Sequence, residues 1–149
     1  MNVHEERACE NFTKGYNCAQ AVSAAFAEEM QMTEKQAARL SSAFGGGMGR
    51  MREVCGAVSA MCMVLGVLYG YDEPEDKVKK ELYEKVQSLA EEFKREHKTI
   101  ICRELLGTDG SQSSVPTPRT PDFYKSRPCL SFVKSAARIL ARYIKSNPV

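Results

Sequence analysis

Tryptophan is absent from this sequence, histidine occurs only twice, and aromatic residues make up 8% of the chain. Proteins that stack on nucleic-acid bases need aromatic side chains. A formal net charge of +2 is too small to attract nucleic acid or an anionic membrane. We therefore expect neither as a partner. No arrangement of Ser, His and Asp and no pair of carboxylates can be argued as a catalytic group.

Long apolar runs are also missing. The most apolar stretch, residues 54–69, is shorter than the roughly 20 residues that a membrane span needs, and Cys and Ser interrupt it. The N-terminus has neither a basic start nor an apolar run, which is unlike a signal peptide. These patterns predict a cytoplasmic protein in which the apolar stretch is a buried core helix.

Strand signals are almost absent, whereas helix signals recur along the whole chain. Asn17 and Thr33 are favourable N-caps, and Thr33 forms a Thr-x-x-Gln capping box with Gln36. Gly70 and Gly107 are expected to end helices. Helices are expected over residues 3–13, 18–30, 33–44, 53–69, 72–98 and from 128 onward, with residues 99–106 either ending the fifth of these or forming a short helix of their own.

The chain of 149 residues suits one domain, residues 1–149, with one core. Residues 108–127 are rich in Gly, Ser, Thr and Pro, which predicts a loop of about 20 residues. The fold class is therefore all-α: a bundle of about five to six helices with a long loop before the last one. Two apolar stripes are expected to face the core, Val78, Leu82, Val86, Leu89 and Phe93 in one helix, and Phe132, Val133, Ala136, Ala137, Leu140 and Ile144 in the last.

The sequence has six cysteines. A cytoplasmic chain of this length does not need disulfides, so the surplus indicates metal, cluster or redox chemistry. Cys9 and Cys62 are interpreted as packing residues. The other four lie at or near the starts of predicted helices, where the helix dipole lowers the pKa of a thiol; they are Cys18, Cys55, Cys102 and Cys129. No Cys-x-x-Cys pair exists, so a shared site depends on the fold bringing these residues together.

A glycine cluster precedes Cys55. Residues 45–49 read Gly-Gly-Gly-Met-Gly and cannot continue a helix cheaply. Such a turn can direct several N–H groups at one anion, and Arg50 and Arg52 add positive charge. The alternative is a plain helix–helix turn that needs positive φ, and both interpretations stay open.

Several sequence pieces together resemble the C_GCAxxG_C_C family. They are Gly-Tyr-Asn-Cys-Ala-Gln at 15–20, Phe-Gly-Gly-Gly-Met-Gly-Arg at 44–50, Cys-Gly-Ala-Val-Ser-Ala at 55–60, Cys-Arg-Glu-Leu-Leu-Gly at 102–107 and Pro-Cys at 128–129. They follow the family's order over roughly residues 12–144. One position departs from the family motif, which has Gly where this sequence has Ala60.

The resemblance implies that the family's four shared cysteines correspond to Cys18, Cys55, Cys102 and Cys129. It implies redox activity, which is inferred for the family from these cysteines and from neighbouring oxidoreductase and transporter genes. Similar domains joined to multihaem cytochromes are associated with an iron–sulfur centre. No substrate follows from the resemblance.

We therefore expect an iron–sulfur cluster, preferably of the 2Fe–2S type, that transfers electrons to an unidentified redox partner protein. The metal ligands would be the same four cysteines, and the predicted cofactor-binding residues are Gly45, Gly46, Gly47, Arg50 and Gly56. A metal-free thiol–disulfide redox protein and a helical module with structural zinc are the alternatives. The sequence leaves open whether the protein is an enzyme and whether it forms a homodimer.

Overall fold

The computed structural model describes residues 2–108 and 113–149. In these ranges the chain forms eight α-helices, one 3₁₀-helix and a single isolated β-bridge, so the predicted all-α class is confirmed, with more helices than the expected five to six. The helices are α1 (Val3–Thr13), α2 (Cys18–Ala25), α3 (Glu34–Ser41), η1 (Ser42–Phe44), α4 (Gly56–Tyr69), α5 (Asp76–His97), α6 (Cys102–Leu106), α7 (Pro121–Ser126) and α8 (Cys129–Ser146). None of the described helices has the length and apolar character to cross a membrane.

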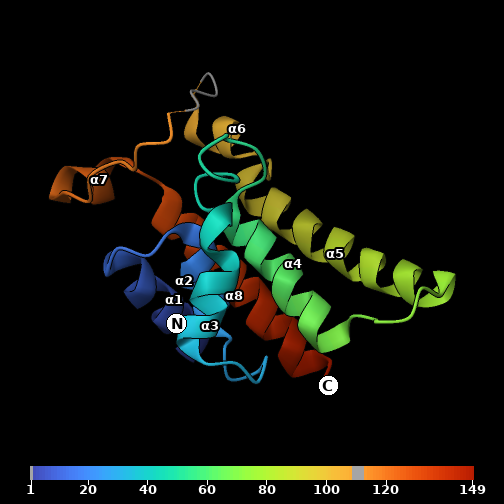
Figure 1. Ribbon diagram of the computed structural model, residues 1–149. Helices are drawn as coiled ribbons and strands as arrows, with labels where there is room; N and C mark the ends of the chain where they lie inside the picture. The colour runs from blue at the N-terminus through green and yellow to red at the C-terminus, as the bar shows by residue number, and fades with distance from the viewer. Residues whose placement is uncertain (1, 109–112) are drawn as a thin grey trace.

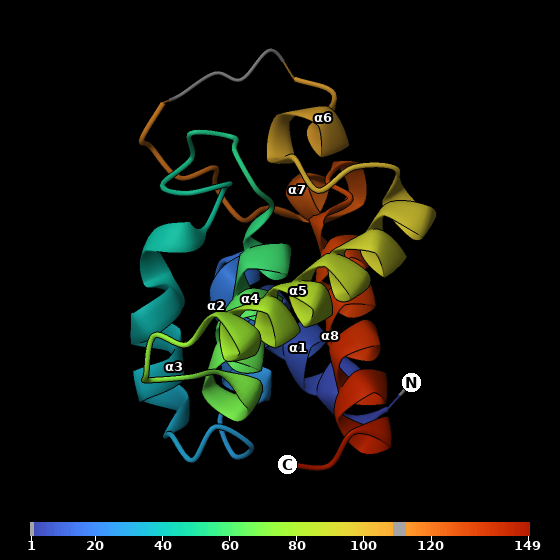
Figure 2. The ribbon, with the colours of Figure 1, turned by 90° about the vertical axis from the view of Figure 1, so that its right-hand side faces the viewer.

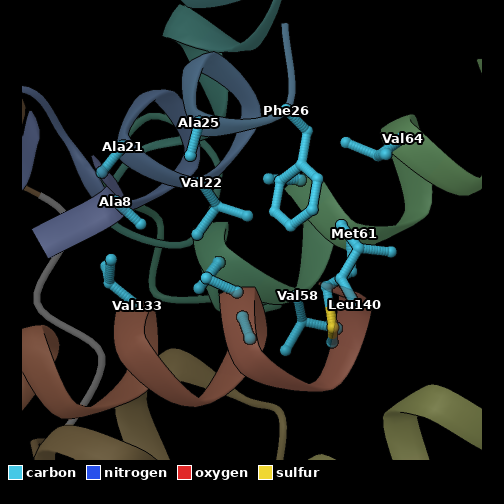
Figure 3. Close-up of a cluster of buried hydrophobic side chains, with 14 of the residues drawn as sticks. Ala8, Ala21, Val22, Ala25, Phe26, Val58, Met61, Val64, Val133 and Leu140 are labelled. Carbon is cyan, nitrogen blue, oxygen red and sulfur yellow. The ribbon is translucent and has the colours of Figure 1, made fainter. Parts of the chain in front are cut away.

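The core lies between α1, α2, α4 and α8 (Figure 1). Helix α2 is rich in alanine, and its small side chains let the neighbouring helices approach closely. Figure 3 shows the result: Phe26 reaches between Val64 and Met61 of α4, while Val133 and Leu140 project from α8. The long helix α5 packs across α4 and α8 through the buried side chains of Leu89 and Phe93, as its stripe predicts.

Capping explains where several helices begin. Asn17 and Thr33 are N-caps, as expected, and Thr33 has its predicted capping box; Asn17 and Asn2 have complete capping boxes as well. Gly107 ends α6 in the left-handed region, with a φ of 66°. Satisfied N–H groups at these ends leave the helix boundaries well defined.

The predicted helix 18–30 is too long. Helix α2 ends at Ala25, because the backbone tightens there: the N–H of Phe26 bonds to Ser23 O at 3.1 Å and that of Ala27 to Ala24 O at 3.3 Å. Phe26 and Met30 nevertheless stay buried. Their apolar periodicity reflected burial in a series of turns rather than a continuing helix.

The predicted loop 108–127 is wrong over residues 121–126, which form α7. Thr120 Oγ1 accepts a hydrogen bond from the N–H of Phe123 at 3.2 Å, and Pro121 occupies the first helical position. Both features favour helix initiation, although the surrounding prolines indicated a loop. Residues 109–112 of this segment lie outside the described residues.

Candidate functional site

The four cysteines of the motif meet at one end of the bundle. Cys18, Cys102 and Cys129 are the first residues of α2, α6 and α8, and Cys55 is the N-cap of α4. Figures 1 and 2 show α6 and the loop before α4 at the end of the bundle where α4 and α8 begin. All four side chains line one cavity of about 450 Å³, so residues far apart in sequence share one space.

A backbone bridge joins the segments that carry Cys55 and Cys102. Val54 and Ile101 form an antiparallel β-bridge. The N–H of Cys55 donates to Ile100 O at 2.7 Å, and the N–H of Cys102 donates to Glu53 O at 2.6 Å. Because residues 53–55 are extended to make these bonds, α4 starts at Gly56 rather than at the predicted residue 53.

Gly56 allows Cys18 to approach α4. A methyl group built on Gly56 would lie 2.6 Å from Cys18 Sγ and 2.8 Å from Phe44 O. Neither contact can be tolerated without movement. Packing therefore explains why glycine follows Cys55: only glycine leaves room for the sulfur of a cysteine from another helix.

The glycine-rich loop has a left-handed backbone. Five consecutive residues, 46–50, have φ between 57° and 72°, and they include the non-glycine residues Met48 and Arg50. Left-handed conformation is normally visited by single residues, because a Cβ atom makes it unfavourable. A run of this length, closed by the bonds from Arg52 N–H to Gly46 O and from Glu53 N–H to Gly47 O, is characteristic of functional sites.

This loop also sets the position of Cys102. A methyl group on Gly47 would lie 2.8 Å from Cys102 Cβ, so the glycine is needed for the loop to pass close to α6. The interpretation as a turn that needs positive φ is confirmed, whereas the anion-binding interpretation stays a prediction. The turn does need positive φ, and its backbone also reaches the cysteines.

Cys18 is the most acidic thiol of the four. Its pKa is lowered to about 6, mainly because the Cys55 thiol donates a hydrogen bond to its sulfur. Backbone N–H groups of Gly46, Gly56 and Ala19 add to this effect, while burial opposes it. At neutral pH the cavity therefore contains a thiolate at residue 18 that is held by hydrogen bonds.

The other three thiols are harder to ionise. The pKa of Cys55 is raised well above its usual value, because its proton is held by Cys18. Burial and the nearby Cys18 raise the pKa of Cys129 to about 11, and burial raises that of Cys102. Burial at Cys102 and Cys129, and the hydrogen bond to Cys18 at Cys55, therefore favour the protonated form of these three thiols.

Four arginines line the same cavity, and no carboxylate is among the described lining residues; the arginines are Arg50, Arg52, Arg119 and Arg127. Arg52 is buried, with 6% of its surface exposed, and its Nη1 lies 3.7 Å from Cys102 Sγ. The positive charge of Arg127 acts to lower the pKa of Cys129, against the larger effect of burial. The cavity is thus built to hold negative charge.

Arg119 closes one wall of the cavity. Its guanidinium lies 4.4 Å from the Phe12 ring centroid and 4.8 Å from that of Phe123. It also donates to Phe12 O and Tyr16 O, both at 2.9 Å. These contacts tie the segment that carries α7 to the end of α1, so this segment is part of the site.

Among the predicted residues, Gly45, Gly46 and Arg50 line the cavity, whereas Gly47 and Gly56 lie behind Cys102 and Cys18. Cys9 and Cys62 are partly buried and do not line the cavity, and neither belongs to the hydrophobic core cluster, so their role as packing residues stays a prediction. Sequence reasoning missed Arg119 and Arg127. The signal was the presence of two arginines in a proline-rich segment otherwise made largely of small polar residues.

Direct metal ligation is not preformed. Within residues 2–108 and 113–149, no three side chains of Cys, His, Asp or Glu form a group that could hold a metal ion. The ligand role of the four cysteines therefore stays a prediction. What the structure provides is a shared cavity, one thiolate and positively charged walls.

The family comparison agrees with this geometry. The family model described as "Putative redox-active protein (C_GCAxxG_C_C)" matches residues 16–143. The chain belongs to this family. No curated protein and no solved structure matches the chain.

Membership of the C_GCAxxG_C_C family assigns the protein to a redox-active class. The one departure from the motif, Ala60, is fully buried in the middle of α4 and is not part of the cavity lining. The extra methyl group is accommodated in the core, as expected for a position that does not contact the site.

Proposed function

We propose that this redox-active protein binds an iron–sulfur cluster at Cys18, Cys55, Cys102 and Cys129 and transfers electrons. The observation that carries the proposal is the meeting of four cysteines from four separate helix starts in one cavity with arginines and no described carboxylate. Cysteine thiolates are the usual ligands of such clusters. When bound, the cluster would accept and release one electron at a time.

The surrounding residues fit an anionic cofactor of this kind. N–H groups of Gly46, Gly56 and Ala19 already bond to the sulfur of Cys18, and Arg52 lies beside Cys102. Donors to the ligating sulfurs stabilise such a cluster and adjust its potential. The positive charges of Arg52 and Arg127 also favour the thiolate form of Cys102, and that of Arg127 favours the thiolate form of Cys129, as ligation requires.

The test is iron and sulfide analysis of protein purified without oxygen from cells supplied with iron and cysteine. We expect a brown protein with bound iron and sulfide. Replacing any one of the four cavity cysteines by serine should abolish or strongly reduce loading, whereas C9S and C62S, which leave the cavity intact, should load normally. Colourless wild-type protein with neither iron nor sulfide would overturn the proposal, and bound zinc without sulfide would favour a structural metal.

A second candidate is a dithiol–disulfide protein, favoured by the hydrogen bond between Cys55 and Cys18. The Cys18 thiolate would attack one sulfur of a partner's disulfide and release the other sulfur as a thiolate. Cys55 would then lose its proton and attack the mixed disulfide. A Cys18–Cys55 disulfide and a reduced partner result, and the two electrons pass to that partner.

Thiol counting separates the two candidates. Metal-free protein treated with a small disulfide should lose two thiols that reductant restores, and mass spectrometry should assign the linkage to Cys18 and Cys55. Scattered linkages, including Cys9 or Cys62, would contradict this second function.

A further inference from the structure

Two cavity arginines converge on one hydroxyl group. Arg50 Nη1 lies 3.1 Å from Thr117 Oγ1, and Arg127 Nη2 lies 3.4 Å from the same atom. Arg50 Nε also donates to Ser113 O at 2.8 Å. A hydroxyl and a carbonyl position the guanidinium groups but do not neutralise them.

This pair has no counterion among the described residues. The ion pairs of arginine are Arg103 with Glu53 and Arg138 with Glu96, and neither includes a cavity arginine. Repulsion is evident at Arg50, whose pKa is lowered by burial and by the charges of Arg52 and Arg127. Both side chains are half-buried, and two like charges held this close repel each other unless an anion lies between them.

The cysteine sulfurs lie beside only some of these arginines. Arg52 lies beside Cys102 and the charge of Arg127 acts on Cys129, whereas the described bonds of Arg50 go to Ser113 and Thr117 alone. Negative charge at Cys102 acts on Arg50 through space, but no described carboxylate bonds to Arg50 or to Arg127. Both guanidinium groups line the same cavity of about 450 Å³.

We infer that the cavity binds a compact oxyanion between Arg50 and Arg127, beside the four cysteines. A carboxylate, phosphate or sulfur oxyanion presents two oxygens that two guanidinium groups can bind together. Binding depends on the arginines alone.

The test measures binding of sulfate, inorganic phosphate and acetate by calorimetry at constant ionic strength, with protein purified without oxygen. R50Q and R127Q should each weaken binding about tenfold, and the double variant about a hundredfold. The matched control is R39Q/R95Q, which removes two exposed arginines that do not line the cavity. It should bind as the wild type does.

Iron and sulfide content is measured on the same samples, so that a missing anion site can be distinguished from a missing cluster. Anion binding that is lost in R50Q/R127Q while circular dichroism is unchanged supports the site, whether or not a cluster is present. Equal binding by R50Q/R127Q and R39Q/R95Q would overturn it, and so would the absence of millimolar binding of all three anions. Binding of an acidic peptide but of no small anion would also overturn it and would indicate a docking surface.

Discussion

The centre of the bundle and its cysteine end are built differently. The centre consists of regular helices with small and branched apolar side chains, such as Ala21, Val22 and Leu140. The cysteine end contains a glycine-rich loop with left-handed backbone and a cavity lined by cysteine and arginine. The difference indicates that packing in the centre stabilises the fold. The cysteine end instead contains backbone strain and repulsion between arginines, which are features of a functional site.

The largest expected effect is in the centre. Phe26 is fully buried and stacks on the His4 ring at 4.4 Å, so Phe26→Ala should lower the free energy of unfolding by about 3–5 kcal/mol. Urea denaturation of reduced, metal-free protein measures this. Val67→Ala, at an exposed position of α4, should change it by less than about 0.5 kcal/mol. Equal effects would mean that the centre is not the stabilising region.

The next effect tests the packing at the cysteine end. Gly56→Ala should lower the free energy of unfolding by about 1–3 kcal/mol, because the methyl group meets Cys18 Sγ at 2.6 Å. Gly66→Ala in the same helix has open space and should stabilise by about 0.5–1 kcal/mol. Urea midpoints of the two variants should therefore move in opposite directions, and a shift in the same direction would contradict the assigned contact.

A smaller effect concerns thiol reactivity within the cavity. Because the pKa of Cys18 is about 6 and that of Cys129 about 11, Cys18 of the metal-free protein is a thiolate at pH 7 and Cys129 is not. Iodoacetamide should label Cys18 at least about tenfold faster, even though a less basic thiolate is less nucleophilic. The Cys18 rate should fall as pH drops through about 6. Peptide mapping measures this, and equal rates would remove the distinction.

The smallest effect tests strain in the loop. Met48 is exposed and has a φ of 65°, so Met48→Gly should raise the free energy of unfolding by about 1 kcal/mol. Met51→Gly, outside the positive-φ run, is the comparison and should destabilise slightly. A loss of stability in both variants would argue that the left-handed loop is not strained.

Local sequence signals predicted most of the helices but not every boundary. The capping boxes at Asn17 and Thr33 and the stop at Gly107 are interactions within a few residues, so they could be read directly. The end of α2 and the presence of α7 could not. After α2, buried apolar residues in turns have the spacing of a helix. At α7, Thr120 and Pro121 start a helix within a proline-rich segment.

Sequence signals likewise predicted only some residues of the candidate site. The four cysteines and the glycine loop were evident from residue types at helix starts. Arg119 and Arg127 were not, because their role depends on contacts with residues roughly a hundred positions earlier, such as Phe12, or on other cavity residues. Long-range pairing leaves no periodic signal in a single sequence.

By itself, the sequence determined that the chain is helical, where most helices start, and which thiols lie at those starts, because these properties follow from neighbouring residues. Only the tertiary structure decided that the four cysteines share a cavity, that Gly56 makes room for Cys18, and that arginines from two distant segments surround the thiols. The physical reason is that a site made from separate helix ends exists only once the core between those helices has packed.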